Sequence, residues 1–552
     1  MSQMLDPAQQ IDEKEQQLLD ACLSKLQAKA STWATLPLSG KIELLQRASQ
    51  NLSDHAQEWV ACVNAQRQIE QHSIWAAEEW YEIYTLAHAL QGYQLTLTRL
   101  DRGEQWLPKH IDTQPNGQIV AHLFPTNTFD RLLFNGISTE VWMQPGITKN
   151  NLKEHIGTAY TSPTKGAVSL VLGAGNVNSI SPLDVLDKLF VHGEVVILKL
   201  NPVNAYLHPL YEKVLAPFID AGFLSIVEGG VPVGSYLVHH PQVDSVHITG
   251  GIQSYNTILY GPGEEGLRRK QLGEPLLKKP ITSELGGASP VIVVPGQWTE
   301  ADIQFQAENI ATMKLYNGGF NCVSAQVLVL PEEWAQREQL VEAIQHLFQQ
   351  VSPMHAYYPG ALQRQLAVQN ACPDAQLFAG DVPRTLVPTV STDEARTSCF
   401  QNEIFAPVLT ITTLPGKTAV SYLKNAIKFC NESLVGNLGA NVIVSPEVQS
   451  SYKEEVETAV SDLRYGAIGV NVWGGLIYRL TQNPWGAFQD PEATDIGSGK
   501  GMVHNTLLFD KPQKSVIRGQ FRPFPRSWRH GNPVIMPKPP WFITHRQRMK
   551  TA

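Results

Sequence analysis

The sequence predicts a mixed α/β protein built on parallel sheets. Between residues 167 and 294, short β-rich runs such as AVSLVL, EVVILK and DSVHITGG alternate with stretches long enough for helices. That alternation is typical of parallel strands joined by crossover helices. A second α/β stretch runs from about residue 300 to residue 480.

A helical region precedes these strands. Up to about residue 100, apolar and aromatic residues recur at steps of three and four, which is the spacing of one helix face. His88 lies on such a stripe, and we interpret it as a packing residue. From residue 118 to 150 the pattern is less regular, and STEVWMQPG predicts a strand that ends in a turn.

The composition excludes several classes of protein. With 552 residues, 43% hydrophobic and 17% charged, the chain can bury more than one core, and its length suggests two to four domains. A net charge of −8 gives no overall basic field, so no nucleic-acid partner is expected. No run of about 18 apolar residues occurs, so no membrane association is expected either.

The start of the chain and the cysteines predict a cytoplasmic protein. Acids and glutamines occupy the N-terminus, where a signal peptide needs basic residues followed by an apolar core. The six cysteines form no CxxC pair and no Cys/His cluster with zinc spacing. We therefore expect reduced thiols and no metal.

The C-terminal tail is strongly basic. Such a run could bind nucleic acid or an anionic surface, but the prolines and aromatics within it favour an arm that wraps an acidic neighbouring subunit. No acid follows Ser515. The basic residues after that point include Arg518, Arg522, Arg526, Arg529, Lys538, Arg546, Arg548 and Lys550.

Three short segments carry candidate chemistry. Cys322 closes a glycine-rich turn in KLYNGGFNC, where its amide and sulfur can both face a cleft, although an isolated free cysteine is more often a buried filler. Glu284 precedes paired glycines in SELGG, and it is either a general base with a raised pKa or a surface carboxylate. Asn176 follows a strand in LGAGNVN. Its neighbours match only part of a dinucleotide-binding loop, because Asn178 replaces the third glycine of GxGxxG.

Taken together, six segments resemble the ordered landmark motifs of the aldehyde dehydrogenase superfamily. They are LKLNP, HITGG, SELGGASP, NGGFNC, NEIFAPVL and AIGVNV with the later NPWGAF, and they span roughly residues 165 to 490. The resemblance implies an aldehyde dehydrogenase-like α/β fold with a Rossmann-type dinucleotide-binding domain, an α/β catalytic domain and an oligomerisation element. It also implies an NAD(P)-dependent oxidoreductase acting on a small-molecule aldehyde, and a homo-oligomer, either a dimer or a tetramer.

The resemblance assigns the catalytic roles residue by residue. Cys322 corresponds to the nucleophile, Glu284 to the general base and Asn176 to the oxyanion-stabilising amide. In that scheme the thiolate attacks the aldehyde, hydride leaves for the nicotinamide, and water activated by Glu284 hydrolyses the resulting thioester.

It also assigns six residues to the cofactor. Lys199 and Glu403 correspond to groups that hold ribose hydroxyls, and Phe405 to the aromatic residue beside the nicotinamide. Gly250 and Gly251 fall in the turn before a helix whose N-terminus faces the pyrophosphate, a position that favours negative charge. Leu285, next to Glu284, completes this set.

The implied domains are three. Residues 1–285 would hold the helical region and the dinucleotide-binding domain, with a strand-like oligomerisation segment near residues 137–165. Residues 286–480 would form the catalytic domain. Residues 481–552 would form a return segment and the basic arm.

The sequence departs from the family pattern at three positions. Pro202 stands where an acid usually holds the adenosine ribose, which leaves NAD and NADP both possible. Gly251 replaces a serine and Ala288 replaces a lysine, as in an outlying, bacterial-type branch. Two alternative functions stay open: a CoA-acylating aldehyde dehydrogenase or acyl-CoA reductase, against which Glu284 argues, and a catalytically silent scaffold of the same fold.

Overall fold

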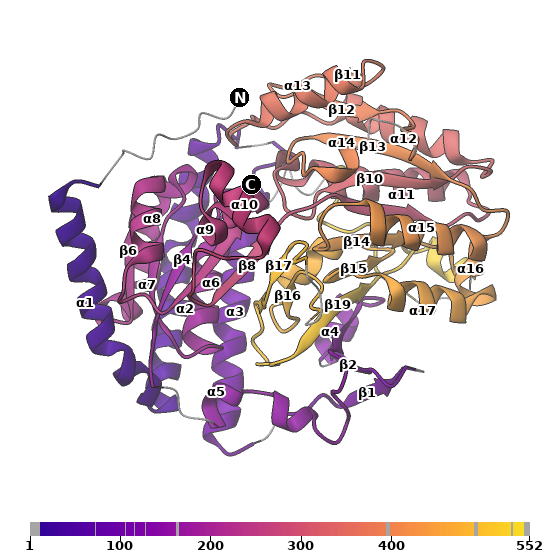
Figure 1. Ribbon diagram of the computed structural model, residues 1–552. Coiled ribbons are helices and arrows are strands. Elements are labelled where there is room, and N and C mark those ends of the chain that lie inside the picture. Colours follow the sequence, from indigo (N-terminus) through magenta and orange to yellow (C-terminus); the bar gives the residue numbers. More distant parts are fainter. Residues whose placement is uncertain are drawn as a thin grey trace.

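The computed structural model describes residues 11–71, 73–104, 106–114, 116–126, 128–161, 165–392, 398–490, 495–530 and 534–545. These residues form two large sheets, each covered by helices, that lie beside one another (Figure 1), and a small two-stranded sheet, β16-β18. The prediction of parallel sheets with crossover helices is confirmed. Within the described residues, no helix is both long enough and apolar enough to cross a membrane.

The first sheet has six strands in the order β17-β8-β7-β4-β5-β6. Its five long strands are parallel, and the chain starts in the middle at β4, moves outward to β6, and then returns to the other side of β4. That reversal marks the point where open α/β sheets bind ligands. The strands are β4 (Val168–Leu172), β5 (Val195–Lys199), β6 (Leu224–Val227), β7 (Ser245–Gly250), β8 (Ile281–Leu285) and the short antiparallel β17 (Gly499–Lys500).

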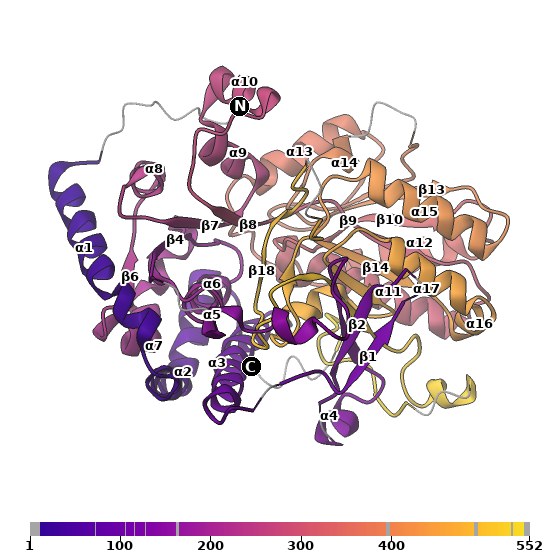
Figure 2. The ribbon, with the colours of Figure 1, turned by 60° about the horizontal axis from the view of Figure 1, so that its bottom comes forward.

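Helices cover both faces of this sheet, because its central strands are apolar on both sides. Figure 2 shows α8, α9 and α10 on one side and α6 and α7, with α2 and α3 next to them, on the other. The helix α1 packs along β4, β5 and β6. The helices are α1 (Glu13–Thr35), α2 (Leu38–Gln66), α3 (Glu78–Asp101), α6 (Ile180–Phe190), α7 (His208–Asp220), α8 (Val231–His239), α9 (Ile252–Tyr260) and α10 (Gly263–Leu272), with the 3-10 turn η2 (Pro202–Leu207) before α7.

The second sheet has eleven strands in the order β1-β2-β3-β19-β15-β14-β9-β10-β13-β12-β11. Its seven strands from β19 to β12 are parallel, and antiparallel strands extend it at both ends. The strands are β1 (His110–Thr113), β2 (Ile119–Phe124), β3 (Ser138–Met143), β9 (Ser289–Val293), β10 (Ala325–Pro331), β11 (Gln376–Phe378), β12 (Arg384–Val387), β13 (Val408–Leu414), β14 (Gly439–Ile443), β15 (Ala467–Val470) and β19 (Pro512–Arg518).

Around this sheet, α11 and α12 pack together against β10, and α15 and α17 pack together near β13. The long elements are α11 (Glu300–Leu315), α12 (Arg337–Gln350), α13 (Ala361–Ala371), α15 (Ala419–Ser433) and α17 (Lys453–Asp462). The short elements are α4 (Thr128–Leu133), α5 (Thr158–Thr161), α14 (Ser398–Gln401), α16 (Pro446–Ser451), η1 (Leu152–His155), η3 (Tyr316–Gly319), η5 (Gly474–Arg479), η6 (Arg526–His530) and the strands β16 (Trp485–Gly486) and β18 (Met502–Val503).

The segment predicted as strand-like, residues 137–165, is a strand only as far as Met143. Strand β3 pairs with β19 over its whole length, so this segment and the tail do come together, in a sheet of their own chain. Gly146 has a φ of 88°, and after this turn the backbone continues into η1 and α5 rather than into another strand. Residues 162–164 lie outside the described part.

The basic tail was expected to wrap a neighbouring subunit, but its described part packs on its own chain. Arg518 bonds Glu140 and Glu457, and Arg522 bonds Asp302 and Glu447. The acids that neutralise the tail thus lie on the chain's own helices and strand β3, and the buried Trp541, Phe542 and Ile543 anchor its end. The side chain of Arg529, and Arg546, Arg548 and Lys550, lie outside the described part.

The ion pair between Arg522 and Asp302 predicts a stability effect that does not depend on protein concentration. Both side chains are buried, and Nε lies 2.9 Å from Oδ1. Replacing the cation leaves a buried carboxylate with poorer compensation, so Arg522→Met is expected to lower the free energy of unfolding by at least about 2 kcal/mol.

Urea unfolding at two protein concentrations a hundredfold apart tests this. The control Arg268→Met removes an exposed pair with Glu265 on α10 and should leave the stability close to that of the wild type. An Arg522→Met effect that grows on dilution would mean that the tail docks on a partner instead.

Candidate active site

Cys322 lies between the two sheets, at the end of a sharp turn that links α11 to β10. The turn needs three consecutive residues in the left-handed region: Asn317, Gly318 and Gly319 have φ values of 53°, 63° and 83°. A Cβ atom on Gly319 would lie 2.9 Å from the Cα atom of Pro407, which is too close for any side chain. Asparagine tolerates this backbone region better than most residues, so the local sequence explains how the thiol is presented.

Glu284 reaches the same point from the other sheet. It lies at the carboxyl end of β8, and its Oε1 accepts a hydrogen bond from Sγ of Cys322 at 3.4 Å. Five residues later the chain is already in β9 of the second sheet. The segment between β8 and β9 lies directly against the carboxylate of Glu403. A Cβ atom on Gly286 would lie 1.7 Å from Oε1 of Glu403, so only glycine fits at this position. The paired glycines therefore let Glu284 and Cys322 meet.

Asn176 joins this pair through the turn. It follows β4, is buried, and donates from Nδ2 to the carbonyl oxygen of Phe320 at 3.2 Å. The side chain of Asn317 donates to the carbonyl oxygens of both Asn176 and Phe320, at 3.1 and 2.9 Å. All three predicted catalytic residues are thus brought together.

Burial dominates the electrostatics of the pair. It raises the pKa of Glu284 to about 7, and the nearby Asp184 adds to this rise. Burial also raises the pKa of the Cys322 thiol well above its ordinary value, reinforced by the negative charges of Glu284 and Glu403. The thiol therefore rests in its neutral form and donates to a carboxylate that can accept a proton near neutral pH.

Four of the six predicted cofactor residues lie along the carboxyl edge of the first sheet. Lys199 ends β5, where burial lowers its pKa, and Gly250 and the buried Leu285 end β7 and β8. Two strands separate Lys199 from Glu284, a span of roughly 14 Å at the usual strand spacing. That spread suits an extended ligand rather than a compact one.

The N-terminus of α9 is open at this edge. Its N-cap is Gly251, no side chain caps the helix, and a Cβ on Gly251 would meet nothing within 4 Å. Free amides at such a helix end favour a phosphate group. Near Lys199, the side chain of Asn201 caps η2 and lies against Gly175, and Pro202 begins that turn. The backbone thus fits a dinucleotide, while the usual acid is absent.

Glu403 and Phe405 come from a loop of the second sheet that two cations hold, the buried Lys314 and the half-buried Arg364. Arg364 donates to the carbonyl oxygens of Ile404 and Phe405, and Lys314 donates to that of Ala406 at 3.0 Å. These bonds support Phe405 at a φ of 46°, a strained value for an aromatic residue. Burial raises the pKa of Glu403 to about 7, although Arg364 and Lys314 oppose the rise.

A network of buried charged side chains holds the loop that carries Asn176 and the turn that carries Cys322. This network was not identified from the sequence. Arg67, at the end of α2, donates to the carbonyl oxygen of Asn176 at 2.9 Å and to Oδ1 of Asn317 at 3.3 Å. Its guanidinium lies 4.1 Å from the ring centroid of Tyr357, whose hydroxyl also donates to the carbonyl oxygen of Asn176. The cation therefore fixes the loop that carries Asn176 against the turn that carries Cys322.

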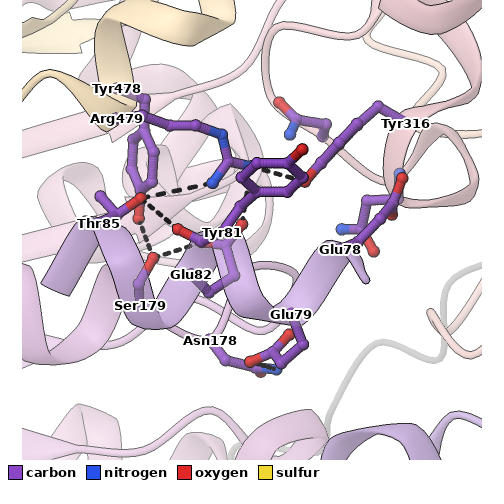
Figure 3. A network of polar contacts seen from close by, with 12 residues as sticks. Glu78, Glu79, Tyr81, Glu82, Thr85, Asn178, Ser179, Tyr316, Tyr478 and Arg479 are labelled. Atoms are coloured by element: carbon purple, nitrogen blue, oxygen red, sulfur yellow. Dashed lines mark hydrogen bonds and ion pairs between the residues drawn. The ribbon is translucent and has the colours of Figure 1, made fainter. Parts of the chain in front are cut away.

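Three acids at the start of α3 complete this network (Figure 3). Glu78 accepts from the amide of Asn317, and Glu79 from Asn178 at 3.0 Å. Glu82 accepts from Ser179 at 2.5 Å and from Arg479 at 3.1 Å, and Arg479 also donates to the hydroxyl of Tyr316. The signal in the sequence was a cluster of three acids at the start of a largely apolar helix.

The raised pKa of Glu284 predicts how stability depends on pH. Between about pH 4.5 and pH 7 the folded protein keeps a proton that the unfolded chain has lost, so this residue makes stability fall as pH rises. Glu284→Gln removes that loss. The variant should gain up to about 3 kcal/mol over the wild type at pH 8 and nothing at pH 4.

Urea unfolding at the two pH values measures this difference. Cys322→Ala serves as the control, since it removes the contact but keeps the buried carboxylate, and should retain the wild-type pH dependence. Equal stability differences for Glu284→Gln at pH 4 and pH 8 would show that Glu284 ionises normally in the fold.

Comparison with known proteins agrees with this geometry. Residues 186–490, more than half of the 552-residue chain, match the aldehyde dehydrogenase family. An aldehyde dehydrogenase of Craterostigma plantagineum is 25% identical over 398 residues, covering 69% of this chain and 75% of that protein. Aldehyde dehydrogenase family 3 member A2 of Pongo abelii is 22% identical over 302 residues, covering 53% of this chain and 57% of that protein.

The fold matches solved structures over almost its whole length. A Mycobacterium tuberculosis aldehyde dehydrogenase solved with NAD+ aligns with a TM-score of 0.60 and 17% identity, covering 90% of this chain and 89% of that one. A Sinorhizobium meliloti NAD-dependent aldehyde dehydrogenase aligns with a TM-score of 0.59 and 17% identity, covering 92% of this chain and 88% of that one. The chain therefore belongs to the aldehyde dehydrogenase family, whose members are oxidoreductases that act on aldehydes with NAD or NADP.

Proposed function

We propose that the protein oxidises an aldehyde to a carboxylic acid, with NAD or NADP as hydride acceptor, through a thioester on Cys322. The observation that carries this proposal is the hydrogen bond between Sγ of Cys322 and the buried carboxylate of Glu284. Hydrolysis of a thioester needs a base beside the sulfur, and Glu284 fills that role. A CoA-dependent enzyme has no such requirement, so the same contact disfavours the acylating alternative.

The first chemical step forms the carbon–sulfur bond. Glu284 accepts the thiol proton, and the Cys322 thiolate attacks the aldehyde carbon. The amide of Cys322 and the second N–H of the Asn176 side chain can donate to the resulting oxyanion; removing one such donor typically costs about 3 kcal/mol. A bound nicotinamide supplies the hydride acceptor.

The second step releases the acid. Once Glu284 has released the thiol proton to solvent, it accepts a proton from water, and the hydroxide adds to the thioester carbon. The carbon–sulfur bond then breaks, and the Cys322 thiolate takes back a proton from Glu284. Lys199, Glu403 and the open N-terminus of α9 would hold the cofactor, with Gly250, Gly251, Leu285 and Phe405 lining its path. The three-domain division and the homo-oligomer remain part of this proposal.

Rapid-mixing measurements of NADH and NADPH formation with aliphatic and aromatic aldehydes test the function. The wild type should give a burst of reduced cofactor followed by turnover, and Cys322→Ala should give neither. Glu284→Gln should keep a slower burst of one equivalent and lose turnover by a factor of about 100 to 10,000. The matched control Cys62→Ala removes another partly buried free thiol and should behave like the wild type.

Other outcomes would point elsewhere. Turnover that starts only when CoA is added would identify the acylating reaction. The absence of any burst over the whole aldehyde panel, with binding of neither dinucleotide, would indicate a silent scaffold.

A further inference from the structure

Three donors converge on the backbone carbonyl oxygen of Asn176. Nη2 of Arg67 donates to it at 2.9 Å, Nδ2 of Asn317 at 3.1 Å and the hydroxyl of Tyr357 at 2.7 Å. The hydroxyl of Tyr357 also lies 3.1 Å from Oδ1 of Asn317, and its single hydrogen goes to the shorter contact. Because donors from three separate segments hold this carbonyl, they fix the peptide group of Asn176 and the direction in which its side chain leaves the backbone.

Arg67 and Tyr357 act together in this arrangement. The guanidinium of Arg67 lies 4.1 Å from the ring centroid of Tyr357, a distance at which a cation is attracted to an aromatic ring. Arg67 also donates from Nη1 to Oδ1 of Asn317 at 3.3 Å and from Nη2 to Oδ1 of Asn178 at 3.2 Å. A guanidinium is planar and bonds several acceptors in one fixed geometry. Arg67 therefore holds the loop after β4 and the turn η3 in one relative position.

Asn178 extends this hold to an acid. In the sequence it stands where a dinucleotide-binding loop has its third glycine. In the structure it is buried, accepts from Arg67 through Oδ1, and donates through Nδ2 to Oε1 of Glu79 at 3.0 Å. Glu79 also accepts from Nε1 of Trp59 at 2.7 Å. The asparagine side chain thus bridges a buried cation and a buried acid, which a glycine could not do.

The side chain of Asn176 is the group that this arrangement places. Its Nδ2 donates to the carbonyl oxygen of Phe320 at 3.2 Å, which uses one of its two N–H groups. The other N–H is the one that can donate to the oxyanion in the mechanism described above. Such donors are effective because they are in place before the negative charge forms, and a displacement of about 1 Å can lower a rate by about a hundredfold.

We propose that Arg67 and Tyr357 are positioning residues for the oxyanion. By holding the carbonyl of Asn176, they keep the second N–H of its side chain directed at the oxygen that becomes negative when the Cys322 thiolate adds to a carbonyl carbon. They act through Asn176 and do not touch the reacting atoms. The inference rests on the proposed function, in which Cys322 is the nucleophile and Asn176 stabilises the oxyanion.

Two reactions of the Cys322 thiol separate this role from a merely structural one. With 4-nitrophenyl acetate, Glu284 takes the thiol proton, the thiolate adds to the ester carbon to form an oxyanion, and nitrophenolate leaves as the acetyl group stays on sulfur. Iodoacetamide alkylates the same sulfur by displacing iodide from a saturated carbon, which forms no oxyanion. The ratio of the two rate constants, followed by nitrophenolate absorbance and by intact mass, reports oxyanion stabilisation apart from thiol reactivity.

Arg67→Met is expected to lower the rate constant of acetylation by about tenfold or more and to leave that of alkylation nearly unchanged. Tyr357→Phe, which keeps the ring and loses one donor, should show a smaller loss of the same kind. Asn176→Ala should show a larger one. Because Arg67 acts through Asn176, adding Arg67→Met to Asn176→Ala should cost little more.

The control Arg522→Met separates positioning from stability. Arg522 is another buried arginine, and its ionic partners are Asp302 and Glu447. Its loss is expected to destabilise the fold but to keep the wild-type ratio of acetylation to alkylation.

A wild-type ratio in Arg67→Met, whether both rates fall or neither does, would overturn the proposal. A further loss in the double variant as large as the loss in Arg67→Met alone would overturn it as well. If Arg67→Met does not fold, Tyr357→Phe decides, and an unchanged ratio there would contradict the proposal. A wild type whose Cys322 is alkylated but never acetylated would instead contradict the proposed function.

Discussion

The contact between Sγ of Cys322 and Oε1 of Glu284 joins the two halves of the molecule, because each residue is presented by a different sheet. Glu284 comes from the end of β8, and Cys322 from the turn that feeds β10. Two glycine pairs make the contact sterically possible: Gly286 and Gly287 at the crossing, and Gly318 and Gly319 in the turn. Larger residues at Gly286 and Gly319 would collide with Glu403 and with the backbone of Pro407.

Holding these groups requires an interior that is unusually rich in charge. Burial raises the pKa of Glu79, Glu284 and Glu403 to about 7, so the fold keeps three carboxylates where ionisation is unfavourable. Arginines and amides compensate for part of that burial around the catalytic loops. Charges arranged in this way destabilise the fold and fix the geometry of a site, which is the usual compromise between stability and function.

Residues whose role follows from a local motif could be predicted from the sequence. Asn176, Glu284 and Cys322 each lie near the end of a strand or in a glycine turn that a short sequence motif identifies. The structure brings all three together. Arg67 could not be predicted, since its partner Asn317 is 250 residues away and a buried arginine contradicts the hydrophobic pattern of its helix. The charge of the basic tail correctly indicated that it contacts acidic residues. Charge alone could not show that these acids, among them Glu140 and Asp302, belong to the same chain.

The coupling between thiol and carboxylate can be measured directly through the reactivity of Cys322. The negative charge of Glu284 raises the pKa of the thiol, so the rate of alkylation by iodoacetamide should rise with pH around a lower midpoint in Glu284→Gln than in the wild type. Peptide mass spectrometry would confirm Cys322 as the labelled residue. A midpoint that does not move would contradict the account, because it would mean that the two side chains do not interact.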